Sequence, residues 1–202
     1  LASRMVTELN CNWKLVNENL MDVYHFQTLH DDSFGAHLDG EKFQIKLTER
    51  GGVSAYYEAA PMVPEGKSLF GAMPWLGEEN INLGCMGHLP PNLHIFGRGD
   101  AVTPFVIWPV APGHTQIFVH HLFPEEFHSL PDFQQKLQFY YDYQIQIVSE
   151  DSDMVEGMQK NMGSRRFVPG PMSKLEETVH NVINGYLTRA FGEQGLGTTV
   201  EK

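Results

Sequence analysis

The chain has 202 residues, of which 42% are hydrophobic, which is enough for one compact domain with a buried core. Its 14 basic and 25 acidic residues give a net charge of −11, which excludes nucleic acid as an expected partner because phosphates would be repelled. No apolar run approaches the ~20 residues that span a bilayer, and two cysteines, Cys11 and Cys85, provide no disulfide framework, so we expect no membrane contact and a cytoplasmic location.

Residues 12–30 predict a helix. Apolar side chains recur there in steps of three or four, at Trp13, Val16, Leu20 and Tyr24, which is the spacing of a buried helical stripe. The Asp, Ser and Gly content of residues 31–40 then predicts a loop.

The middle of the chain predicts an antiparallel sheet. Residues 43–59 contain two runs of β-type composition around Arg50-Gly51-Gly52, which is typical of a hairpin. Gly and Pro clusters separate four further short segments for which we expect strands: residues 68–77, 92–99, 101–112 and 114–124.

The last third of the chain predicts two helices. Residues 129–164 contain no Gly or Pro between Phe133 and Glu156, which predicts a long helix with room for an interruption near residues 149–153. Residues 173–192 begin with a capping box of Ser173 and Glu176 and end on a glycine. The order predicts an α+β fold whose helices pack on one face of the sheet.

Asp22, His25 and His30 form the pattern Asp-x-x-His-x-x-x-x-His. Two neutral imidazoles and a carboxylate bind a divalent first-row metal and leave other positions open. On a straight helix the two histidines would point about 140° apart, so the helix must bend or end between them. A third ligand would come from the acidic cluster at residues 149–159. Spacing alone leaves open that the histidines are unrelated and that the acidic run is a solvated helix face.

Residues 12–30 resemble the start of the catalytic domain in the large (alpha) subunit of Rieske non-haem iron oxygenases, the ring-hydroxylating oxygenases. The matching residues are Asn12, Trp13, Lys14, Glu18, Asn19, Asp22, His25 and His30. The resemblance continues in PPNLHIF, in PVAPGHTQIFVHH and in SEDSDMVEGMQKNMGS, and it covers most of residues 12–191. It implies a helix-grip fold of the Bet v 1/START type, in which a curved antiparallel sheet wraps around a long C-terminal helix.

The resemblance implies that His25, His30 and Asp151 bind a mononuclear Fe(II). Asp151 belongs to the Glu-Asp pair that precedes the family's Glu-x-x-Gln, and Asp153 is the alternative. The chain departs from the family's Gln-Arg-Gly by reading Gln-Lys-Asn after this point. The resemblance also implies that Asp22 carries electrons to the iron. Its carboxylate would bridge a histidine that binds the iron and a histidine that binds the Rieske cluster of a neighbouring subunit.

The implied activity is the use of O2 to hydroxylate or dihydroxylate an aromatic or related small organic substrate, as in aromatic hydrocarbon catabolism. Electrons would come from a Rieske [2Fe–2S] cluster, supplied by a ferredoxin or reductase, in a homotrimer. Because no Rieske Cys-x-His and Cys-x-x-His pair is present, we expect residues 1–202 to be a single catalytic domain that lacks its Rieske domain and is inactive without it.

Four residues are candidates for an apolar substrate pocket, although an ordinary core role suits them equally: Met21, Phe26, Tyr143 and Ile147. Asn19 is a further candidate, which would hold a water or a backbone group in this pocket. His120 and His121 would point to opposite faces of a strand, and neither is expected to be a ligand. Two other functions remain open, a non-catalytic helix-grip module that binds an apolar ligand and a zinc hydrolase with an open water position.

Overall fold

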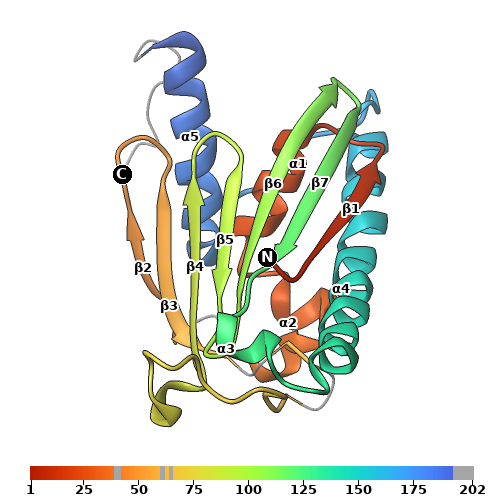
Figure 1. Cartoon of the computed structure of the whole chain (residues 1–202). Helices are drawn as coiled ribbons and strands as arrows, with labels where there is room; N and C mark the ends of the chain where they lie inside the picture. Colours follow the sequence, from red (N-terminus) through yellow and green to blue (C-terminus); the bar gives the residue numbers. More distant parts are fainter. Residues whose placement is uncertain (39–41, 60–61, 64–65, 193–202) are drawn as a thin grey trace.

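A seven-stranded antiparallel sheet in the order β1-β7-β6-β5-β4-β3-β2 is the frame of the structure, a computed structural model that describes residues 1–38, 42–59, 62–63 and 66–192 (Figure 1). Every neighbouring pair of strands is antiparallel. The strands are β1 (Ser3–Leu9), β2 (Gln44–Leu47), β3 (Val53–Glu58), β4 (Leu83–Leu89), β5 (Leu93–Gly97), β6 (Val102–Ala111) and β7 (His114–His121).

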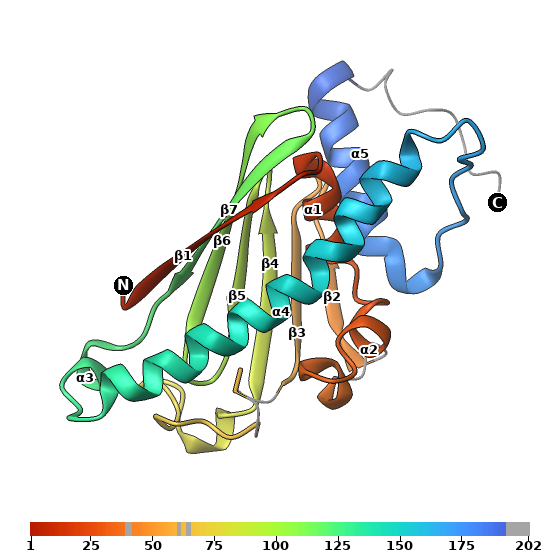
Figure 2. The ribbon, with the colours of Figure 1, turned by 90° about the vertical axis from the view of Figure 1, so that its right-hand side faces the viewer.

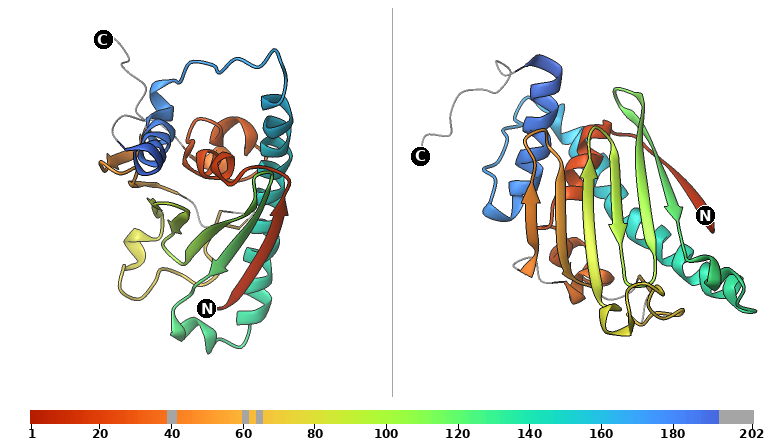
Figure 3. Two further views of the ribbon diagram at one scale, coloured as in Figure 1. Left: turned by 90° about the horizontal axis from the view of Figure 1, so that it is seen from above. Right: turned by 60° about the vertical axis from the view of Figure 1, so that its left-hand side comes forward.

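Helices cover one face of this sheet. The helices of the described residues are α1 (Trp13–Met21), α2 (Phe26–Leu29), α3 (Glu125–His128), α4 (Phe133–Met162) and α5 (Glu177–Phe191), with short 3₁₀ turns η1 (Phe34–His37), η3 (Glu78–Asn80) and η4 (Lys174–Glu176). Of these, α1, α4 and α5 make the cover. The long helix α4 crosses the sheet diagonally (Figure 2), and the sheet lies in front of α1, α4 and α5 in the right-hand view of Figure 3. The contacts of α1 with β6, α4 with β1 and α5 with β3 agree with this arrangement, which confirms the α+β helix-grip prediction.

The core lies between the sheet and the helices. Side chains of β6 and β7 alternate inward and outward, so Ile107 and Val119 are fully buried against Val155 of α4. Burying one such aliphatic side chain is worth about 1.5–3 kcal/mol. This packing holds α4 on the sheet, and α4 carries the acidic cluster of residues 149–159.

The predicted hairpin of residues 43–59 is present as β2 and β3. Gly51 adopts a φ of 78° in the turn, a conformation that favours glycine. The capping box of Ser173 and Glu176 is also present, and α4 runs without interruption through residues 149–153.

One strand prediction was wrong, and two strands were not predicted. Residues 68–77 form no strand, because Gly71 and Gly77 have positive φ and the Ser68 hydroxyl accepts hydrogen bonds from the backbone of the segment. The sequence reading missed β1 and also β4. Glycines obscure the pattern of β4, and one of them, Gly84, lies so close to Tyr57 that a Cβ atom would come within 2.8 Å of its ring.

The predicted helix of residues 12–30 is in fact two helices with a break between them. The loop predicted at residues 31–40 contains η1, and its last two positions lie outside the described residues.

Candidate metal centre

The chain turns sharply at Asp22, and this turn sets the position of both motif histidines. Helix α1 ends at Met21, and Asp22 adopts an extended conformation with φ −79° and ψ 106°. Its carboxylate accepts a hydrogen bond from the backbone N–H of Tyr24 at 2.8 Å, a local contact that competes with helix continuation.

The one-turn helix α2 then separates His25 from His30. The break therefore lies before His25, whereas the sequence predicted it between the two histidines. His25 immediately precedes α2 and His30 immediately follows it, and their ring centroids lie 5.1 Å apart. A single short turn thus brings both imidazoles to one side.

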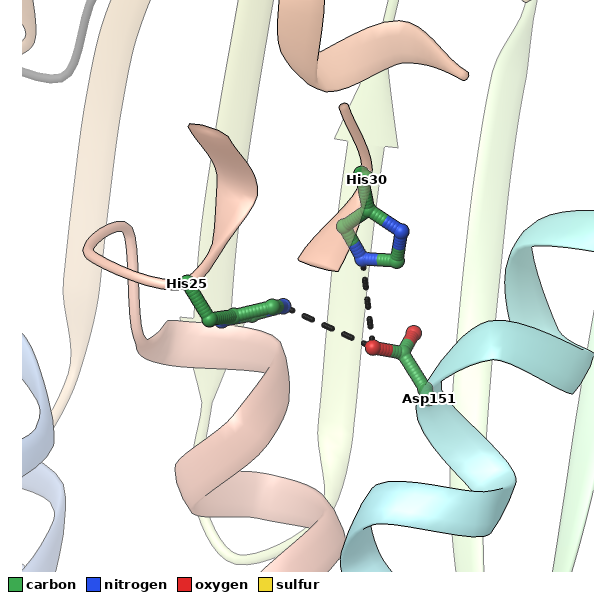
Figure 4. Close-up of side chains that lie close together, drawn as sticks. All are labelled: His25, His30 and Asp151. Atoms are coloured by element: carbon green, nitrogen blue, oxygen red, sulfur yellow. Dashed lines mark ion pairs between the residues drawn. The ribbon is translucent and has the colours of Figure 1, made fainter. Parts of the chain in front are cut away.

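Both imidazoles point at one oxygen of Asp151 on α4 (Figure 4). The Nε2 atom of His25 lies 3.5 Å from Asp151 Oδ1, and the Nε2 atom of His30 lies 3.2 Å from the same oxygen. His25 is 8% exposed and His30 only 1% exposed. Within the described ranges, these residues form the one group of three or more His, Cys, Asp or Glu side chains whose ligand atoms converge within 4.8 Å.

A carboxylate holds the other nitrogen of each ring. His25 Nδ1 lies 3.3 Å from Asp22 Oδ2, and His30 Nδ1 lies 2.7 Å from Glu150 Oε2. Ser33 supports Glu150 by donating its hydroxyl to the same Oε2 at 2.8 Å. Because an ionised carboxylate only accepts hydrogen bonds, each Nδ1 carries the proton, and a neutral ring then presents the lone pair of Nε2 to Asp151.

Three electron-rich atoms that face one another need a cation between them. In the metal-free protein a proton takes this place. Burial lowers the pKa of His25, but hydrogen bonds and negative charge from Asp151 and Asp22 outweigh burial and raise it to about 9. Burial likewise raises the pKa of Asp151, but hydrogen bonds from His25 and His30 outweigh it and lower the value to about 2.

The donor set fits a divalent first-row metal. It consists of two imidazole nitrogens and one carboxylate oxygen, and Asp151 Oδ1 is buried without a hydrogen bond of normal geometry. Asp153, the alternative carboxylate, is exposed and lies outside this group.

A cavity adjoins the three residues. Asn19, Phe26 and Ile147 line it, as predicted for a pocket, and Asn19 also lowers the pKa of Asp151 through a hydrogen bond. Met21 and Tyr143 do not line it: Met21 is fully buried in the core, and Tyr143 is buried on α4.

The sequence reading missed several residues of this site. Glu150 was detectable as the neighbour of Asp151, whereas Ser33 and Arg98 carried no sequence signal because only the fold brings them here. Arg98 lies in the turn between β5 and β6 and lines the same cavity as the two motif histidines.

A larger cavity of about 190 Å³ lies between α1 and α5, but it contains no convergent metal donors. It is lined by Trp13, Lys14, Asn17, Glu18, His88, Pro90, Pro91, Val182, Ile183, Tyr186, Leu187 and Arg189. Of the histidine pair on β7, His121 is buried and receives a contact from the Ser3 hydroxyl, while His120 is partly exposed on the other face.

The chain matches a known protein family. The family model described as ring hydroxylating alpha subunit (catalytic domain) matches residues 2–189. No curated protein sequence matches the chain. None of the described helices is both long and apolar enough to cross a bilayer.

Solved structures share the fold. A quaternary ammonium Rieske monooxygenase superposes with a TM-score of 0.67 at 19% identity, over 98% of this chain and 50% of its own. Dicamba monooxygenase gives a TM-score of 0.64 at 16% identity, over 93% of this chain and 60% of its own. Naphthalene 1,2-dioxygenase from Rhodococcus sp. gives a TM-score of 0.65 at 14% identity, over 95% of this chain and 56% of its own. The chain therefore spans about half the length of these proteins.

Proposed function

Because the chain belongs to the family of ring-hydroxylating alpha subunits, as their catalytic domain, we propose that it is the oxygenase domain of such an enzyme and that His25, His30 and Asp151 bind a mononuclear Fe(II). The observation that carries this proposal is the convergence of two Nε2 atoms on one oxygen of Asp151, with each Nδ1 held by a carboxylate.

A bound Fe(II) would supply the activation of O2 for insertion into an organic substrate, for which we propose an aromatic or related small molecule. The residues of this chain contribute binding, orientation and exclusion of water. Asp22 and Glu150 orient the two imidazoles, and the low exposure of His30 keeps bulk water from that side of the site. Apolar side chains such as Phe26 and Ile147 form much of the adjoining wall, against which an organic substrate would pack.

Electrons would reach this site through Asp22. Its carboxylate contacts His25 Nδ1, and its side chain retains 22% exposure, which leaves room for a second histidine from a cluster domain. One of the structurally similar proteins, the quaternary ammonium Rieske monooxygenase, is described with inter-subunit electron transfer. By analogy we propose a homotrimer in which the [2Fe–2S] cluster of a neighbouring subunit, reduced by a ferredoxin or reductase, supplies the electrons.

This proposal assigns the catalytic domain to residues 1–202 and the Rieske cluster to residues outside it, so the chain alone would bind iron without turning over. Cys11 and Cys85 are both free, which suits a reducing cytoplasm.

The two alternative functions are less well supported. A zinc hydrolase could use the same three ligands, and a binding module could use the same cavity. Neither accounts for the family match over residues 2–189. A binding module also has no use for two carboxylates that orient two buried imidazoles.

The experiment is an ¹⁸O2 incorporation assay on iron-loaded protein that carries its Rieske domain and reductase. Naphthalene, benzoate and toluene are the first substrates. Incorporation of ¹⁸O into a product by wild-type protein, and its loss in His30→Ala, is the expected result. Iron-loaded, reducible protein that incorporates no ¹⁸O into any member of a broad aromatic panel would contradict the proposal.

A further inference from the structure

Arg98 is a buried cation inside the cavity that adjoins His25, His30 and Asp151. We propose that Arg98 binds a carboxylate group of the substrate, so that this site takes a carboxylate-bearing organic molecule in preference to a neutral hydrocarbon. The inference rests on the proposed function, because a molecule bound at Arg98 is a substrate only if the neighbouring site is that of an oxygenase. The binding step itself can be tested without iron.

The contacts of Arg98 leave most of its hydrogen-bonding capacity unused. The side chain is only 6% exposed. One Nη donates to the Tyr57 hydroxyl at 2.8 Å, the other contacts the Met62 sulfur at 3.4 Å, and the buried Nε has no partner. A guanidinium offers five N–H donors, and a thioether is a weak acceptor.

No carboxylate of the described residues forms an ion pair with Arg98. Asp100 is the nearest candidate by sequence, but it is fully buried and accepts a hydrogen bond from Tyr140 instead. Burial raises the pKa of Asp100, although hydrogen bonds and the charge of Arg98 act in the opposite direction. Asp151 faces the two histidines. A buried charge that has no ion-pair partner among the described residues is costly, so the site favours an anion from outside.

The surroundings of Arg98 suit the rest of such a molecule. The guanidinium lies 5.3 Å from the ring centroid of Tyr57, which holds its plane in position. The other walls are mainly apolar and aromatic, with Phe26, Phe34, Phe96, Phe105 and Ile147. A planar guanidinium binds a carboxylate through two parallel hydrogen bonds, which fixes the orientation of the bound molecule.

The free volume limits the size of the ligand. The cavity measures about 50 Å³. A cavity of about 150 Å³ holds benzene, so an aromatic ring enters here only when lining side chains move, while acetate needs less room. A useful set of probes therefore pairs small and aromatic carboxylates with their neutral amides: acetate with acetamide, and benzoate with benzamide.

The test measures binding of these four probes to the metal-free protein by calorimetry and by the rise in Tm that each probe produces. Wild-type protein, Arg98→Gln and the control Arg166→Gln are compared, since Arg166 is exposed. We expect wild type and Arg166→Gln to bind each carboxylate more tightly than its amide. In Arg98→Gln the ratio of these two affinities should fall by about ten-fold or more. An unchanged preference in folded Arg98→Gln, or none in wild type, would overturn the proposal.

Two further measurements keep the test decisive. If Arg98→Gln fails to fold, Arg98→Lys replaces it, and weaker binding of benzoate with unchanged binding of benzamide is expected because the two-pronged contact is lost. Equal changes for both probes would contradict the role. Iron content is measured in parallel. A wild-type domain that holds no iron would count against the proposed function, while the probe preference would still decide the role of Arg98.

Discussion

Glu150 and His30 are joined by a 2.7 Å contact between Oε2 and Nδ1, and Glu150 directly precedes Asp151 on α4. One turn of α4 thus provides both carboxylates around His30: Glu150 contacts its Nδ1, and Asp151 faces its Nε2. We expect Glu150→Gln to lower metal affinity by about 10–100-fold, because loss of a carboxylate that orients a ligand imidazole has that effect.

The measurement is a competition titration with a chelator. Asp153→Asn is the matched control, since it removes an exposed acidic charge from the same turn. Equal affinities of Glu150→Gln and Asp153→Asn would show that Glu150 does not support the site.

Metal binding should release a proton from His25. In the metal-free protein the pKa of His25 is raised from 6.5 to about 9, so the ring is protonated at pH 7.5, whereas a metal ligand must be neutral. Asp151, with a pKa lowered to about 2, is already ionised and releases none. About one proton per metal is therefore expected at pH 7.5, and the number falls toward zero as the pH rises through 9.

Calorimetry in two buffers with different ionisation enthalpies counts these protons. The same number of protons released at pH 7.5 and at pH 10 would contradict the assignment of the titrating group to His25. The raised pKa of His25 also affects the stability of the metal-free fold. Its stabilising contribution is fully present below pH 6.5 and is lost as the pH rises through 9.

Gly35 holds the two histidines in place through close backbone packing. Its backbone N–H donates to the carbonyl of His30 at 2.9 Å, and a Cβ atom would overlap the carbonyl oxygen of Phe26. Gly35→Ala must push α2 away, so we expect a loss of about 1–3 kcal/mol in unfolding free energy together with weaker metal binding. Gly113→Ala, in open space at the β6–β7 turn, is the control and should change neither. Urea unfolding and metal titration check both variants, and an unaffected Gly35→Ala would argue against this packing.

A variant at Asp22 distinguishes two roles of this residue, the orientation of His25 and the transfer of electrons. In protein that carries its Rieske domain and is kept in excess Fe(II), Asp22→Ala should retain most of its iron even if its affinity falls as in Glu150→Gln, because His25, His30 and Asp151 remain. Turnover should nevertheless fall at least about ten-fold. Iron analysis and steady-state oxygen consumption are measured on the same sample. Turnover close to that of the wild type would mean that Asp22 is no bridge.

The fold could be predicted from the sequence where the pattern is local. Residues 43–59 carry a hairpin signal in their own turn, and α4 is long enough to show its periodicity. The segments that were missed depend on distant partners: β1 becomes a strand by pairing with β7, and β4 has a glycine where Tyr57 of β3 packs. The break at Asp22 depends on one side-chain contact with Tyr24, which no periodicity reveals.

The candidate site divides in the same way. The spacing of His25 and His30 and the resemblance to a family pointed to a ligand set that includes Asp151, and the structure brings these three side chains together. The groups around them come from elsewhere in the chain. Ser33 reaches the site through η1 and Arg98 through the β5–β6 turn, so their roles could be read only after folding had placed them.

The most direct test of the central claim is the iron content of protein loaded anaerobically with Fe(II), compared among wild type, Asp151→Ala and Asp153→Ala. Two imidazoles and one carboxylate bind a single metal ion, so about one iron per chain is expected for wild type and Asp153→Ala, with most of it lost in Asp151→Ala. Full iron in Asp151→Ala, or none in folded wild type, would contradict the assignment of His25, His30 and Asp151 as the iron ligands.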